Sequence, residues 1–89
     1  MPELSRLPEL SRREVALLRA TAEDRVDLTG SAEPDVRVDG LPFCDPTTAR
    51  ALVHAGLVEP ATPVAPGRRA PARLTAAGAA ALGLAHLAA

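Results

Sequence analysis

The segment from residue 60 to residue 71 constrains the fold of this chain most strongly, because four of its residues are proline and one is glycine. Proline lacks an amide donor and blocks an α-helix, so this segment is predicted to be a stiff, extended loop. Leu57 and Val58 before the loop and Ala72 and Leu74 after it are apolar. We expect these two short stretches to be strands that flank the loop and form a β tongue.

A helix signal lies directly before this tongue. Asp45 is suited to accept hydrogen bonds from the first free amides of a helix, and Pro46 suits the first helical position, where no donor is needed. Gly56 fits the left-handed position that often ends a helix. The sequence therefore predicts a helix over residues 46–55, whose outward side chains include Arg50 and His54.

A second helix signal follows the tongue. Thr75 is a suitable cap for a helix that ends near residue 87, and residues 74–89 contain no charged side chain. A helix without a polar face is usually buried on more than one side. Because a chain of 89 residues has little core to offer, we expect the helix over residues 75–87 to form the interface of a homodimer.

The N-terminal half combines one helix with strands. Ser11 and Glu14 have the spacing of a capping box, which predicts a helix over residues 12–23. Apolar and polar residues then alternate in two runs separated by turn residues, a pattern typical of a short β-hairpin. Residues 1–10 are predicted to be a flexible arm, and residues 11–89 are predicted to form one domain.

Charge is distributed unevenly, although the net charge is only −1. Residues 1–45 carry six Arg against ten acidic residues, whereas residues 46–89 carry four Arg against one acidic residue. The basic half is the one with the two flanking helices and the tongue, which is a modest indication of a polyanionic partner. The chain shows no secretory signal and no membrane-spanning run, so a cytoplasmic protein without a membrane partner is expected.

Chemical motifs are absent from the sequence. No nucleophile–base pair, phosphate-binding loop or set of metal ligands is present, so we expect neither an enzyme nor a cofactor or metal site. The single cysteine, Cys44, excludes an internal disulfide, and its spacing from His54 matches no tetrahedral zinc pattern. We expect Cys44 to be buried beside the cap of the helix that follows it.

Three stretches carry a resemblance to a known family. Residues 52–58 look like the end of a recognition helix that runs into a wing strand, residues 67–69 look like a wing tip, and residues 73–78 look like the return into the next helix. Over about residues 45–82 the chain resembles winged helix-turn-helix proteins, in particular bacterial regulators related to the multiple-antibiotic-resistance repressors. The predicted fold is therefore a small α+β, winged-helix-like domain with three helices, short antiparallel strands and a Pro/Arg-rich wing.

The resemblance implies a homodimeric transcription regulator that binds double-stranded DNA. It places the helix over residues 46–55 in the major groove and the wing over residues 59–73 on the sugar–phosphate backbone. The DNA-contacting residues that it implies are Thr47, Thr48, Arg50, His54, Arg68, Arg69 and Arg73. One departure is clear: residues 24–44 favour strands and turns where the family has the first helix of the helix-turn-helix.

A second function fits the same pattern. A winged-helix module that binds another protein, through its wing or its exposed hairpin, requires no DNA contact. The near-neutral charge and the missing helix favour this alternative, whereas the basic half and the arginines of the wing favour DNA binding.

Overall fold

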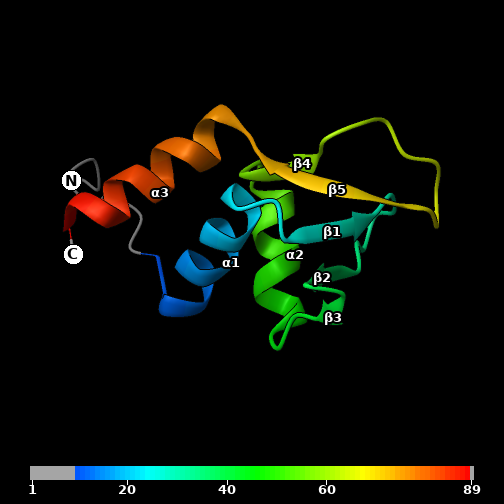
Figure 1. The fold of residues 1–89 in the computed structure, drawn as a ribbon, viewed down its shortest axis with the longest axis horizontal. Coiled ribbons are helices and arrows are strands. Elements are labelled where there is room, and N and C mark those ends of the chain that lie inside the picture. Colours follow the sequence, from blue (N-terminus) through cyan, green and yellow to red (C-terminus); the bar gives the residue numbers. More distant parts are fainter. Residues whose placement is uncertain (1–9, 89) are drawn as a thin grey trace, which may run out of the picture.

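The computed structural model describes residues 10–88, and the predicted arm lies outside these residues except for Leu10. In chain order the elements are α1 (Arg12–Ala22), β1 (Val26–Thr29), β2 (Val36–Val38), β3 (Leu41–Pro42), α2 (Pro46–His54), β4 (Val58–Pro60), β5 (Arg69–Leu74) and α3 (Ala76–Ala88) (Figure 1). The strands form one antiparallel sheet in the order β3-β2-β1-β5-β4. The predicted α+β class is confirmed, and the arrangement is compatible with a winged-helix-like domain.

The first two of the three predicted helix starts are formed by the expected caps. The Ser11 hydroxyl accepts from the amide of Glu14 at 3.1 Å, and the Glu14 carboxylate accepts from the amide of Ser11 at 2.7 Å. At α2, the Asp45 carboxylate accepts from the amide of Thr48 at 3.1 Å. Gly56 follows α2 with a φ of 79°, a left-handed conformation that glycine adopts without strain.

Strands fill the region between α1 and α2. Val26 pairs with Val38 across β1 and β2, as the alternation predicts. Asp39 and Gly40, with φ values of 54° and 81°, form a two-residue turn that joins β2 to β3, because such turns need positive φ at both central positions. The part of the chain between α1 and α2 therefore consists of strands and turns, as its sequence predicts.

The returning strand of the wing begins earlier than its sequence indicates. The returning strand was expected to begin at residue 72, but β5 begins at Arg69. The reason is that β1 offers a free edge, so that Thr29 pairs with Arg69 and Asp27 with Pro71. The carbonyl of Pro71 accepts a hydrogen bond from the amide of Ala61 at 2.8 Å, on the side of β5 that faces β4. The nitrogen of Pro71, which has no hydrogen to donate, lies on the same side, where β4 has already ended.

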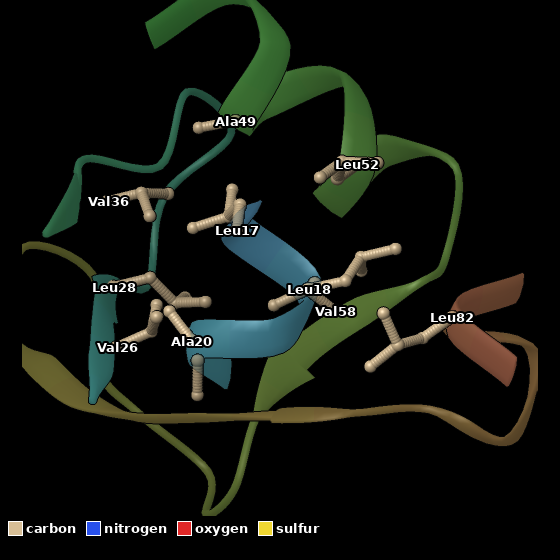
Figure 2. Packing of buried hydrophobic residues seen from close by; sticks show 11 residues of the cluster. Leu17, Leu18, Ala20, Val26, Leu28, Val36, Ala49, Leu52, Val58 and Leu82 are labelled. Carbon is tan, nitrogen blue, oxygen red and sulfur yellow. The ribbon is translucent and has the colours of Figure 1, made fainter. Parts of the chain in front are cut away.

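The hydrophobic core lies between α1 and the inner face of the sheet (Figure 2). Leu17 and Leu18 of α1 are 1% and 0% exposed and lie at the centre of the cluster. Ala49 and Leu52 anchor α2 to this core, whereas Leu82 is the buried leucine of α3. Ala49 and Leu52 lie on the inner face of α2, whereas Thr47, Ala51 and His54 on its other side are exposed. None of the helices within residues 10–88 is long and apolar enough to cross a bilayer.

Ion pairs stabilise the turn at Asp39 and the helix cap at Asp45. The Arg25 guanidinium donates to Asp39 at distances of 2.8 to 3.2 Å, and these bonds hold the pKa of the Asp39 carboxyl below its usual value. Hydrogen bonds from the Thr48 hydroxyl and amide, and then from Arg13, lower the pKa of Asp45 in the same way. A carboxylate with a depressed pKa stabilises the folded state above its ordinary pKa of about 4, and this contribution is lost as the pH falls through the folded-state pKa.

We therefore predict that the melting temperature falls as the pH is lowered from neutral into the range where these two carboxylates are protonated. Replacing Asp39 by Asn keeps a side chain that tolerates positive φ but removes the titrating group. The D39N variant should be less stable than the wild type at neutral pH and should lose less stability on acidification. Circular dichroism melts across the pH range measure both effects. An identical acid-induced loss in the two proteins would contradict the role assigned to Asp39.

Candidate nucleic-acid interface

The outward face of α2 borders a shallow, open depression. Its volume is about 310 Å³, and its lining residues are Glu33, Thr47, Arg50, Ala51 and His54. Thr47, Ala51 and His54 are exposed, as the helix pattern predicts. Glu33 does not belong to α2, so part of this depression is built by another segment.

That segment is the loop between β1 and β2, residues 30–35, which we call the acidic loop because it carries Glu33 and Asp35. The Ala32 carbonyl oxygen lies 2.9 Å from Nε2 of His54. Arg50 lies 3.7 Å from the Glu33 carboxylate and donates through Nε to the Pro34 carbonyl at 3.4 Å. Two of the polar side chains expected to face DNA are therefore bonded to the acidic loop.

The same loop also contacts the wing. The amide of Gly30 donates to the carbonyl of Arg68 at 3.0 Å, and Gly30 forms an isolated bridge with Pro66. A Cβ at position 30 would lie 2.6 Å from the side chain of Val64 and 2.8 Å from its carbonyl oxygen, so only glycine permits this approach. The acidic loop thus connects the outer face of α2 with residues 61–68, the segment between β4 and β5 that we call the wing loop.

The two neighbouring arginines of the wing have different surroundings. Arg69 was expected at the wing tip, but it lies in β5 and is paired with Asp27 and with Asp35, the latter at 2.6 Å. The early start of β5 accounts for this difference, because it brings Arg69 beside β1. Arg68 remains in the wing loop with an exposed side chain, and none of the residues described here pairs with that side chain.

Thr48 and Arg73 do not join this surface. The Thr48 hydroxyl donates to the Asp45 carboxylate at 2.7 Å, so this side chain belongs to the helix cap. Arg73 pairs with Glu59 at 2.8 Å, four residues along β5 from Arg69 and therefore about 13 Å away along the strand. Of the seven residues singled out in the sequence, Thr47, Arg50, His54, Arg68 and Arg69 lie where the acidic loop meets the outer face of α2 and the wing.

Cys44 differs from its expected environment. It was expected to be buried beside the helix cap, but its side chain is exposed, because the neighbouring Phe43, and not Cys44, packs against the core. Among residues 10–85, whose side chains the structure describes, no three His, Cys, Asp or Glu side chains are grouped closely enough to hold a metal ion.

The residues that sequence reasoning missed at this surface are Glu33, Asp35 and Asp27. The composition of residues 30–35 predicts a loop, and this prediction is confirmed. Nothing in the local pattern indicates where such a loop folds. The one available signal is the excess of acidic residues in the N-terminal half over a basic C-terminal half, which favours contacts between the two.

Comparison with other proteins adds no further assignment. No protein-family model matches the chain, and the searches of curated proteins and of solved structures give no match.

Proposed function

We propose that this chain is a small winged-helix-type regulator that binds double-stranded DNA through the outer face of α2 and the wing loop. The observation that carries the proposal is that α2 and the wing loop meet one common segment, the acidic loop, and so belong to one surface. A helix that directly precedes a β-hairpin on one surface is the arrangement that winged-helix proteins use for DNA. Thr47 and Arg68 are the exposed side chains available for first contact.

Contacts between arginine side chains and the phosphates of the DNA backbone are expected to dominate this binding. Arg68 is a cation at an exposed loop, and Arg50 and Arg69 are held in pairs that remain partly accessible to solvent. Partly exposed ion pairs are weak, about 0–1 kcal/mol each, so a DNA phosphate is able to replace a carboxylate as the partner of these arginines. Each phosphate neutralised steepens the dependence of affinity on salt concentration.

The prediction for Arg68 follows from this picture. Arg68→Ala should weaken binding to a labelled random duplex by roughly threefold to tenfold at low salt, and should reduce the slope of log affinity against log salt by about 0.9, the loss of one phosphate contact. Fluorescence anisotropy at several salt concentrations measures both quantities. The matched control is Arg12→Ala, an exposed arginine on α1, which removes the same charge.

Two results would contradict the proposal. Wild-type protein that fails to bind duplex at low salt would overturn DNA binding as a whole. Equal weakening by the Arg68 and Arg12 variants would show that only net charge matters, and would remove the wing loop from the contact surface.

A second function, binding to another protein without DNA, is supported by a different observation. Ion pairs within the chain already engage most of the arginines in the region described, namely Arg13, Arg25, Arg37, Arg50, Arg69 and Arg73. The edge strand β3 also carries Leu41, which is 69% exposed. Under this alternative the exposed hairpin is the contact edge, and duplex binding is absent at every salt concentration.

We further propose that two copies associate through α3. The helix runs away from the sheet, at the opposite end of the molecule from the wing loop (Figure 1). Within residues 76–85 its inner side contacts the chain through Gly78 and Leu82, while the exposed side is made of alanine, glycine and Leu84. A face without charge offers nothing to a charged partner but is complementary to its own copy, as a two-fold interface requires.

A further inference from the structure

The acidic loop lies across the surface that we propose binds nucleic acid. It lies against the outer face of α2 at one end and against the wing loop at the other. Its two carboxylates face the arginines of the proposed contact surface: Glu33 faces Arg50, and Asp35 faces Arg69. A carboxylate beside an arginine occupies the same donors that a phosphate oxygen would use.

The loop is held in this position by neutral contacts as well as by charge. The Thr29 hydroxyl accepts from the amide of Asp35 at 2.8 Å, and the amide of Thr29 donates to the carbonyl of Asp35 at 3.2 Å. Pro34 is buried, which fixes the backbone between the two acidic residues. The loop therefore covers the surface as an ordered segment of the fold.

The ion pair between Glu33 of the acidic loop and Arg50 is weak. The Glu33 side chain is 72% exposed, and its distance of 3.7 Å from Arg50 leaves it at the outer limit of an ion pair. Exposed pairs of this kind contribute little and are screened by salt. A polyanion that offers several phosphates at once is able to outcompete the two carboxylates, whereas a single free anion gains little.

We infer that the acidic loop is an autoinhibitory contact, which screens Arg50 and Arg69 from nucleic acid until duplex phosphates displace Glu33 and Asp35. This inference rests on the proposed DNA-binding function. It assigns to the loop a role in setting affinity, so that the intact chain binds more weakly than its arginines alone would allow. It also explains why the surface combines a candidate recognition helix with a local charge close to neutral.

The test is to neutralise the loop and measure duplex affinity. The double variant E33Q/D35N removes both carboxylates while keeping the size of the side chains. The matched control E23Q/D24N removes two negative charges at the opposite end of β1, beyond the C-terminal end of α1. We expect E33Q/D35N to bind the labelled random duplex at least fivefold more tightly than the control at low salt, with a slope steeper by about 1 to 2, because Arg50 loses its carboxylate partner and Arg69 keeps only Asp27.

A single variant guards against loss of structure. Glu33→Gln changes the exposed member of the pair alone and leaves the bonds of Asp35 intact. It should tighten binding in the same direction by a smaller factor, with a circular dichroism melt close to that of the wild type.

The outcomes separate this inference from the proposed function. Equal affinity of E33Q/D35N and E23Q/D24N, in proteins that do bind duplex, would overturn the autoinhibitory role and leave DNA binding standing. Absence of duplex binding by the wild type and all variants would overturn the proposed function and the autoinhibitory role together.

Discussion

Replacing Gly78 by Ala should lower the free energy of unfolding by about 3 kcal/mol or more, because the first turn of α3 rests directly on the backbone that leads into β4. A Cβ at position 78 would lie 2.0 Å from the carbonyl oxygen of Leu57 and 2.9 Å from its carbonyl carbon. No rotamer relieves a clash between a Cβ and a backbone atom, so the helix or the strand must move. For a domain of this size the loss corresponds to a drop in melting temperature of roughly 15 °C.

This close approach is built by several bonds. The carbonyl of Leu57 accepts from the amide of Thr75 at 3.1 Å, and the Thr75 hydroxyl donates to the carbonyl of Gly56 at 2.6 Å. The same hydroxyl accepts from the amide of Gly78 at 3.0 Å, which caps the helix as the sequence predicts. A displaced α3 would therefore lose both its N-terminal cap and its contact with the backbone of Leu57.

Gly83 provides the matched control for Gly78. It lies in the same helix, and a Cβ built at position 83 meets nothing within 4 Å. Gly83→Ala should stabilise the protein by up to about 1 kcal/mol, since alanine favours the helix. Chemical denaturation measures both variants at one protein concentration, because self-association would add to the apparent stability. If the Gly78→Ala variant is as stable as the Gly83→Ala variant, the close contact between Gly78 and the backbone of Leu57 is contradicted.

The second large effect is expected at the exposed face of α3. Ala80 is exposed on this face, and a glutamate there fits a monomer because it is a good helix former. In a symmetric dimer the substitution would bury two like charges against an apolar surface, which is strongly unfavourable. Ala80→Glu should therefore convert a dimer at micromolar concentration into a monomer, measured by light scattering after gel filtration.

Ala16 supplies the control for this experiment. It is an exposed alanine of α1, so Ala16→Glu adds the same charge to another helix surface. We expect Ala16→Glu to retain the wild-type mass. A wild-type protein that is monomeric at all accessible concentrations, or a dimer that both variants leave intact, would contradict the proposed interface.

Local chemistry explains why much of the fold could be predicted from the sequence. Caps depend on neighbouring residues, so Ser11 and Asp45 specified the starts of α1 and α2 correctly. Alternation of apolar residues specified the β1–β2 hairpin, and the prolines excluded a helix from the tongue. The end of α2 also agrees within one residue, since Ala55 forms its C-cap.

Features that depend on distant partners were not predictable in the same way. The sequence pattern predicts Arg69 at the wing tip. This prediction is wrong because β5 pairs with β1, a segment about forty residues away that no local pattern identifies. The acidic loop has the composition of an ordinary turn, and its contacts with His54 and Arg50 depend on where α2 lies in the folded chain. Exposure of Cys44 likewise follows from the packing of Phe43 against the core, which no local pattern specifies.

The central claim is that the outer face of α2 and the wing loop, which the acidic loop connects and partly covers, form one DNA-contacting surface. Amide chemical-shift mapping of the isotope-labelled protein during titration with a short duplex at low salt tests it most directly. The account predicts that the perturbed amides cluster in residues 30–35, 46–54 and 61–69, with α3 and β3 unaffected. Perturbations confined to α3 or to the β3 edge, or none at saturating duplex, would contradict it.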